Sequence, residues 1–337
     1  MGWLLLVLSA CRGASAVLPS VEDDTPADVP VDSAAPEPSE AGGAAAPAES
    51  VGVASAGQPA DADPPDQGSA LEGCGAEPVT VEELHSGRVR GDIAVAPGPL
   101  SASSQKFLVS EAKSGSCLWG AFAADPSRSG AGSGLLLVSY GAPHADGQAC
   151  APGSDGLPDD LKPGDSLLVE GRLDEYVPAA CNGVAPALQL RVDPACPVRR
   201  ARPGPAPEAS VIDRELADRL AGGQDAGLLR DWGGALVKLE GVTALEDPDD
   251  GDAVFPFGVI RLAQTSLEVH SRLYYFDLSL GGPRDAAKTP RYGYPTTFRS
   301  VSGVVFLDYC SWVLAPRDRC TDLTPADAGC GAQAARP

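Results

Sequence analysis

The acidic and imidazole side chains that come closest to catalytic spacing are Glu268 and His270. Residues two positions apart lie on the same face of an extended strand, so this pair could act as an acid and base couple. Cross-strand polar decoration explains the same spacing and is the simpler interpretation. The other histidines, His85 and His144, are far away in sequence, and no Gly-x-Ser-x-Gly, His-Glu-x-x-His or phosphate-loop motif occurs. We therefore expect no enzymatic activity and keep a hydrolase of unknown type as an alternative.

An acidic loop provides the only ligand set that suggests a metal ion. Four carboxylates surround a glycine in this loop, and hard oxygen ligands of this kind suit calcium. The predicted ligands are Asp247, Asp249, Asp250 and Asp252. The later ligands and the closing Glu of an EF-hand are absent, so solvation of the loop is the alternative. We expect no other cofactor.

A looser acidic cluster lies on either side of the segment 161–164. It consists of Asp159, Asp160 and Asp165. Most clusters of this kind are simply solvated at the surface, and we predict solvation here.

The nine cysteines indicate export. No Cys-x-x-Cys pair is present, so the usual spacing of a zinc site is missing. When Cys11 is set aside, an even number remains, which suggests four disulfides in an oxidising compartment. These eight are Cys74, Cys117, Cys150, Cys181, Cys196, Cys310, Cys320 and Cys330. Five precede residue 200 and three follow it, so full pairing requires at least one bridge between the two halves.

The N-terminal stretch MGWLLLVLSAC has the apolar run of an export signal. Leu8-Ser9-Ala10 before Cys11 resembles a bacterial lipobox, which implies a signal segment at 1–10 and lipid attachment at Cys11. Secretory cleavage after Ala16 is the alternative, and a short buried helix is another. No Lys or Arg precedes the apolar run. We expect a lipoprotein of the bacterial cell envelope, in the outer membrane or periplasm, with secretion as the alternative.

Residues 11–72 have the composition of a disordered tether. They are rich in Ala, Pro, Asp, Glu, Ser and Gly and nearly free of large side chains, so they cannot offset the entropy of ordering. One Arg stands against twelve acidic residues in 12–72, and like-charge repulsion with the repeated prolines favours an extended chain. We predict a spacer between a membrane and a folded body.

The remaining chain carries 24 basic and 34 acidic residues, within a total net charge of −21. Non-specific nucleic-acid binders depend on Lys and Arg that neutralise phosphates. This composition therefore argues against nucleic acid as a partner. About 265 residues suffice for two modest domains.

A glycine-centred strand pattern recurs twice in each half of the body, around Gly91, Gly171, Gly241 and Gly303. Glycine inside an alternating strand usually marks a bulge or bend. We predict one domain at 73–199, a Pro-rich linker at 200–210 and a second domain at 211–337. Short helices are expected at 81–85 and 212–220. Strands are expected at 88–96, 105–111, 118–124, 134–140, 165–176 and 187–193, then at 235–246, 257–263, 267–278, 298–308 and 312–315.

Three segments carry a family resemblance. The stretch 161–176 resembles the fourth strand of OB-like domains in secreted bacterial nucleases and surface lipoproteins, 232–242 resembles their first strand, and 298–318 their closing strands. The resemblance implies a mainly β protein with two tandem OB-like barrels, each a five-stranded Greek key with short helices. The resemblance also implies that this chain corresponds to the accessory domains of such nucleases and lacks their catalytic cluster.

In OB-folds, ligands usually cross the face of strands 2 and 3. That face is predicted here to carry aromatic and basic side chains for stacking, with core packing as the stronger alternative. Its members would be Phe107, Trp119, Phe122, Arg272, Tyr274, Tyr275 and Phe276. The expected role is non-catalytic binding or scaffolding. The partners would be the membrane, through the lipid, and an unidentified protein or glycan. A single-stranded nucleic-acid or oligosaccharide binder is the alternative.

Overall fold

The computed structural model describes residues 74–89, 94–111, 117–141, 153, 155–178, 181–201, 203–245, 259–275, 296–318 and 320–325. All of them belong to one compact unit that spans Pro65–Pro337. Its described part is mainly β, as the sequence predicts. The predicted signal segment, Cys11 and the tether at 11–72 lie outside the described residues.

The helices are short and capped by polar side chains. Helix α1 (Val81–His85), which the sequence predicts, begins with a capping box between Thr80 and Glu83. Helix α2 (Arg214–Gly222) ends at Gly223 in the left-handed region, φ 70°. Helix α3 (Ala226–Trp232) was not predicted. Helix α4 (Arg272–Tyr275) interrupts the stretch 267–278, where the strand prediction was wrong. In the described residues, no helix is long and apolar enough to cross a bilayer.

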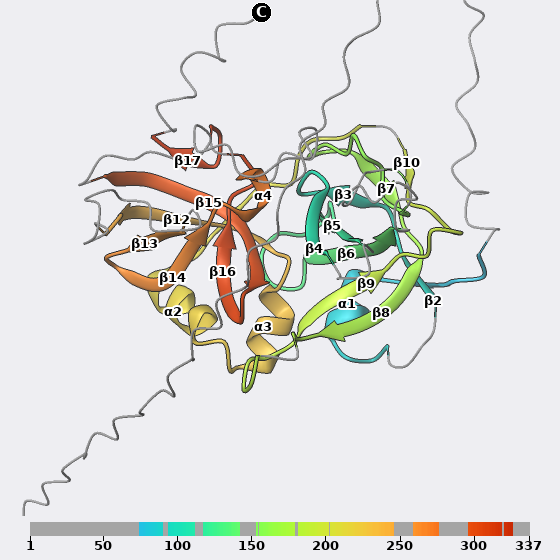
Figure 1. The fold of residues 1–337 in the computed structure, drawn as a ribbon, viewed down its shortest axis with the longest axis horizontal. Helices are drawn as coiled ribbons and strands as arrows, with labels where there is room; N and C mark the ends of the chain where they lie inside the picture. The colour runs from blue at the N-terminus through green and yellow to red at the C-terminus, as the bar shows by residue number, and fades with distance from the viewer. Residues whose placement is uncertain are drawn as a thin grey trace, which may run out of the picture. The chain divides into compact units, whose positions relative to one another are not determined.

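The first sheet has the order β1-β2-β8-β9-β6-β5-β3-β7-β10, with β4 paired to β5. Strands β2 and β3 are two segments of one stretch of chain on either side of Gly98. Since β2 pairs with β8 and β3 pairs with β5, the sheet curls back on itself. Its strands are β1 (Glu77–Val79), β2 (Ala94–Pro97), β3 (Leu100–Ala102), β4 (Phe107–Glu111), β5 (Cys117–Ala124), β6 (Gly134–Gly141), β7 (Ser166–Leu168), β8 (Gly171–Tyr176), β9 (Ala187–Arg191) and β10 (Arg199–Arg200) (Figure 1).

The second sheet has the order β11-β12-β15-β16-β14-β13, with β17 paired to β15. An isolated bridge between Ala244 and Leu262 brings β13 back to the end of β12. Its strands are β11 (Ser210–Val211), β12 (Leu236–Thr243), β13 (Val259–Leu262), β14 (Thr265–His270), β15 (Thr297–Asp308), β16 (Ser311–Ala315) and β17 (Leu323–Thr324) (Figure 1).

The two sheets share one strand plan. In the first sheet, β2 and β3 can be counted as a single bent first strand, followed in the chain by β5, β6, β8 and β9 as the second to fifth strands. The order of neighbours in the sheet is then first, second, third, fifth and fourth, and the fourth strand pairs with the first again. The second sheet follows the same order through β12, β13, β14, β16 and β15. In both, the third and fifth strands are parallel, β6 with β9 and β14 with β16.

The recurrent glycines have different local roles. Gly241 has φ +62° inside β12, a conformation that L side chains rarely adopt. The pairing of β12 with β15 keeps one register on both sides of it, so no bulge is present there. At Gly303 a Cβ atom would lie 2.7 Å from the backbone of Ala315, and this glycine permits close approach of the chain after β16. Gly91 lies outside the described residues.

Alternating side chains divide the apolar residues into three clusters. On β5, Trp119 and Ala121 point into the core of the first sheet, whereas Leu118 and Phe122 point the other way. The second sheet has its own core, to which Val305 and Leu314 belong. Leu118 and Phe122 join a third, inter-sheet cluster. Its buried members are Phe107, Leu118, Phe122, Leu136, Val138, Leu236, Leu273, Val304, Phe306, Val313 and Ala315.

The inter-sheet cluster packs β5 and β6 against β15 and β16. Phe107 and Phe122 stack with ring centroids 5.5 Å apart, and Phe306 meets them edge-on at 5.8 and 5.4 Å. A Cβ atom on Gly134 would lie 2.0 Å from the backbone of Gly234, so the two sheets approach each other there without side chains. The two halves of the body are therefore joined by buried apolar surface.

Disulfides reinforce this arrangement. Cys74 is bonded to Cys196, and Cys181 to Cys310. Cys181 precedes β9 in the first sheet and Cys310 lies between β15 and β16, so the predicted bridge between the two halves exists. Cys117 and Cys320 each take part in a disulfide as well. Cys150 and Cys330 lie outside the described residues.

His85 links α1 to both halves. Its Nδ1 lies 2.5 Å from the carbonyl oxygen of Arg230 in α3, and its Nε2 lies 2.8 Å from the carbonyl oxygen of Gly134 in β6. Burial lowers the pKa of His85 below 6.5. The two carbonyl oxygens and Asp231 oppose this shift, while the guanidinium of Arg230 adds to it.

This lowered pKa predicts a loss of stability in mild acid. Below pH 6.5 the unfolded chain binds a proton at His85 that the folded protein still excludes, so the free energy of unfolding falls as the pH decreases toward the folded pKa. A His85→Gln variant should show a smaller decrease between about pH 7.5 and about pH 5.5, measured by urea unfolding. An equal decrease in the variant and the wild type would contradict this role.

Candidate binding cleft

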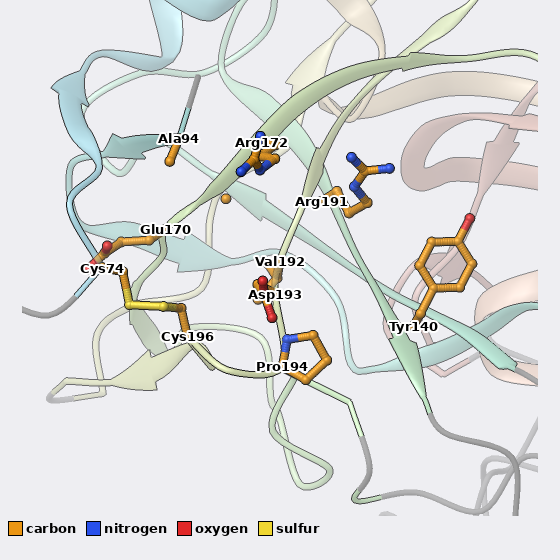
Figure 2. A pocket seen from close by; sticks show the side chains of 11 residues that line it. Cys74, Ala94, Tyr140, Glu170, Arg172, Arg191, Val192, Asp193, Pro194 and Cys196 are labelled. Carbon is orange, nitrogen blue, oxygen red and sulfur yellow. A yellow bond between two sulfur atoms is a disulfide. The ribbon is translucent and has the colours of Figure 1, made fainter. Parts of the chain in front are cut away.

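A cleft of about 350 Å³ opens on the outer face of the first sheet. Strands β2, β6, β8 and β9 contribute to its lining, and the disulfide Cys74–Cys196 closes one side. Figure 2 shows Glu170 and the disulfide toward one end and Tyr140 at the other, with the arginines between them. This volume falls within the range of sites for small ligands.

Two arginines face each other across β8 and β9. Arg172 and Arg191 are directly opposed in the strand register, and both are exposed. Their neighbours Leu173 and Leu190 lie on the opposite, inward face, because successive side chains of a strand alternate. Like charges placed directly opposite destabilise a sheet. Arg172 has a further interaction partner, so an anion placed here would act chiefly on the charge of Arg191.

Glu170 supplies a buried acceptor at the edge of the cleft. Its side chain is only 8% exposed, and Oε1 lies 3.7 Å from Nη2 of Arg199. Oε2 has no hydrogen-bond partner in the described structure. A buried carboxylate oxygen without a donor carries a desolvation cost of about 1–3 kcal/mol or more. This oxygen is enclosed by the protein, so a ligand in the cleft does not reach it without a movement of the Glu170 side chain.

Tyr140 provides an exposed ring at the other end. It is 55% exposed, although the rest of β6 is buried. Asp193 follows β9, and its Oδ1 accepts a hydrogen bond from Ala195 N at 2.9 Å, which fixes the turn beside the cleft. The cleft lining carries Arg172 and Arg191 together with Glu170 and Asp193.

The first three residues of the predicted ligand face are buried. Phe107, Trp119 and Phe122 are at most 1% exposed. Trp119 points into the first core, and Phe107 and Phe122 point into the inter-sheet cluster. Trp119 and Phe122 are three positions apart in one strand and therefore lie on opposite faces. None of the three is accessible to stack on a ligand. All three pack in the core, which was the alternative interpretation.

Arg272 lies on α4, half-buried between the two sheets. Its Nη2 donates to the carbonyl oxygen of Val109 at 2.7 Å, and its Nη1 donates to the hydroxyl of Tyr309 at 3.1 Å. Arg272 therefore holds α4 against β4. Tyr274 and Tyr275 also belong to α4, but their side chains lie outside the description, as does all of Phe276.

Glu268 and His270 do meet, with a third residue. His270 Nε2 lies 3.4 Å from Glu268 Oε2, and Nδ1 lies 3.1 Å from Asp308 Oδ2. Arg261 Nε donates to Glu268 Oε1 at 2.9 Å. Because both ring nitrogens face carboxylates and His270 is only 8% exposed, the network ties β14 to β15. Sequence spacing indicated the pair but not Asp308, which comes from a strand 38 residues later.

The acidic cluster forms ion pairs. Asp159 Oδ1 lies 2.5 Å from Lys106 Nζ, and Asp160 pairs with Arg200. Asp165 Oδ2 accepts from Lys162 N at 2.9 Å and lies 3.6 Å from Arg200. Solvation alone therefore does not describe these residues. Each of them has a basic partner.

The predicted calcium ligands Asp247, Asp249, Asp250 and Asp252 lie outside the described residues. His144, in the segment 142–152, also lies outside them. Within the described residues, no group of three or more His, Cys, Asp or Glu side chains is arranged to hold a metal ion.

A comparison with models of known protein families found no match, and a search of curated proteins found no significant relative. The strand order and the cleft are therefore the features that bear on the class of this protein. The cleft residues Tyr140, Glu170, Arg172 and Arg191 were not predicted as a site. The sequence contained a signal for them, because Arg172 and Arg191 stand at outward positions of two alternating strands.

Proposed function

We propose that this is a non-catalytic binding protein made of two OB-like barrels, exported to the bacterial cell envelope and anchored there through Cys11. The binding site is the cleft of the first sheet, and its ligand carries a negative charge. The acidic tether holds the two barrels away from the membrane.

The strand order supports the OB-like class. An OB-fold is a partly open five-stranded Greek-key barrel. Both sheets run first, second, third, fifth, fourth and back to the first, with parallel third and fifth strands, and α4 follows the third strand of the second sheet. The shared order favours two tandem copies over two unrelated sheets.

Burial of the usual ligand face favours the cleft. In the first sheet the second and third strands are β5 and β6, and their outward side chains Leu118, Phe122 and Leu136 belong to the inter-sheet cluster. A ligand cannot cross a face that the second sheet covers. The cleft instead lies over the third, fifth, fourth and first strands, on the side that remains open.

The observation that carries the proposal is the direct opposition at the cleft of two exposed arginines, Arg172 and Arg191, on neighbouring strands. An anion bound beside them would lie against two guanidinium groups on one open face. Arginine binds carboxylate and phosphate with two parallel hydrogen bonds.

Inorganic phosphate is the simplest probe of the arginine pair. We expect the full chain to bind phosphate weakly, with saturable chemical-shift changes. The Arg191→Gln variant should bind it about tenfold or more weakly, because one charge-assisted contact contributes about 1.5–3 kcal/mol. Arg214→Gln, at an exposed position of α2, is the matched control and should bind like the wild type. Equal weakening in both variants would indicate a diffuse charge effect and refute the site.

Anchoring is tested separately. A Cys11→Ala variant expressed with the whole chain should lose lipid labelling and leave the membrane fraction, because the acylated residue is gone. Unchanged labelling would refute attachment at Cys11. Loss of anchoring should leave phosphate binding at the cleft intact.

A further inference from the structure

We infer that Lys106 and Asp155 condense to an intramolecular amide bond, with Asp159 as the proton carrier and one water molecule as the product. The reaction joins Lys106 Nζ to Asp155 Cγ and needs no cofactor, oxidant or reductant. The pair is therefore a self-modification site, and it is independent of the cleft and its ligand.

Lys106 differs from the other lysines of the described residues in its burial. Its side chain has no exposed surface, whereas Lys162 is exposed and Lys238 is half-buried. Nζ lies 2.6 Å from Oδ2 of Asp155, whose side chain is also fully buried. Trp119 covers another side, with its ring centroid 4.9 Å from Nζ. An amine and a carboxyl group are therefore held in contact where water is excluded.

Burial favours the neutral forms of this pair over two charges. The desolvation cost of a buried ammonium and a buried carboxylate can exceed their mutual attraction. Transfer of one proton along the 2.6 Å contact from Nζ to Oδ2 converts them into an amine and a carboxylic acid. These are the two forms that condense, because the amine has a free lone pair and the acid releases its oxygen as water.

The three acceptors around Nζ account for the three protons of its ammonium form. Asp155 Oδ2 lies at 2.6 Å, Asp159 Oδ1 at 2.5 Å and the carbonyl oxygen of Leu157 at 3.2 Å. The first proton passes to Oδ2, and the second passes to Asp159 when the lone pair of Nζ attacks Cγ. Asp159 then gives this proton to Oδ2, the bond between Cγ and Oδ2 breaks, and water leaves. The third proton stays on the amide nitrogen and donates to Leu157.

The two carboxyl groups are suited to different roles. Leu157 N donates to Asp155 Oδ1 at 2.8 Å, and this oxygen carries the developing negative charge during the attack on Cγ. A donor already in place stabilises that charge. The side chain of Asp159 is 46% exposed, so it connects the buried pair to solvent. Asp155 therefore reacts, and Asp159 carries protons.

The amide cross-links the first sheet. Lys106 immediately precedes β4, and Asp155 follows β6, 49 residues later. Unlike the disulfides, this bond survives reduction. Lys106 is the partner of Asp155 before and after the reaction, so its removal leaves the buried carboxylate alone in both cases.

The test is mass spectrometry of a protease digest of the reduced wild-type full chain. We expect a branched peptide in which a fragment containing Lys106 is joined to one containing Asp155, lighter by one water molecule than their sum. Lys106→Arg keeps a cation between the carboxylates but has no amine, so its two fragments should be separate. Separate fragments in the wild type, or a branch at Asp159 instead of Asp155, would overturn the inference.

Two neighbouring variants test the proton carrier. Asp159→Asn keeps the size of the side chain but cannot accept the proton, so the joined peptide should form about a hundredfold more slowly in pulse-labelled samples taken after synthesis. Asp160→Asn, at the adjacent carboxylate that pairs with Arg200, is the matched control and should react at the wild-type rate. Equal rates in the two variants would contradict the role of Asp159. The wild-type digest decides the bond itself even where a variant folds poorly.

Discussion

A Lys106→Met variant should lose about 3–5 kcal/mol of unfolding free energy, because it leaves a buried carboxylate without its partner. Lys106 Nζ lies 2.6 Å from Asp155 Oδ2, and both side chains are fully buried. The same ammonium group donates to the carbonyl oxygen of Leu157 at 3.2 Å and lies 4.9 Å from the ring centroid of Trp119. Urea unfolding of the full chain measures the loss.

The double variant Lys106→Met, Asp155→Asn is the informative control. The introduced amide would keep an oxygen that accepts from Leu157 N, as Asp155 Oδ1 does at 2.8 Å, but it carries no charge. We expect the double variant to recover at least about 1 kcal/mol relative to the single variant, since no buried charge remains unpaired. Equal stability of the two variants would show that Lys106 contributes by packing rather than by charge.

Removal of the bridge between the halves should have the second large effect. Cys181 and Cys310 are 129 residues apart, and a cross-link across so long a stretch restricts the unfolded chain strongly. The double variant Cys181→Ser, Cys310→Ser should therefore lose about 2–5 kcal/mol. The urea midpoint, measured under non-reducing conditions, reports the loss.

Cys310 lies in the tight turn between β15 and β16. Tyr309 and Cys310 have φ values of 44° and 67° between the paired residues Asp308 and Ser311, a two-residue hairpin that normally takes Asn and Gly. The control Cys74→Ser, Cys196→Ser opens a similar separation of 122 residues but has no such turn. An unchanged midpoint in the Cys181 and Cys310 variant would contradict the account.

The strand plan followed from the sequence because alternation marks strands wherever one face is buried. The stretches 187–193, 298–308 and 312–315 were placed within two residues of β9, β15 and β16. Prediction failed at α4, where the run Arg272–Tyr275 includes strand-forming side chains but forms a short helix soon after β14 ends. Tertiary context decided the local structure there.

The inter-sheet contact was harder to predict. Strands β5 and β6 read as nearly continuous apolar runs, CLWGAFAA and GLLLVSYG, which is typical of strands buried on both faces. That signal identifies a covering layer but not which segment supplies it. The aromatic residues Phe107 and Phe122 were therefore open to two interpretations, and only the packing of Phe306 against them distinguishes core from ligand face.

The cleft depends on contacts distant in sequence. Glu170 meets Arg199, Arg172 meets Arg191, and Cys74 meets Cys196 across 122 residues. Strand alternation predicts that the two arginines point outward, but their direct opposition depends on the register of β8 and β9. A single sequence does not determine this register, because several strand orders are compatible with the same alternation. It does not determine the Cys74–Cys196 pairing either, since eight cysteines allow 105 connectivities.

The most direct test of the account is a map of backbone amide shifts during titration of the wild-type full chain with inorganic phosphate. The account predicts saturable changes that are largest at 170–173 and 191–193, around the opposed arginines. Changes that are largest at Arg261 and Glu268 on β13 and β14, or no saturable change anywhere, would contradict it.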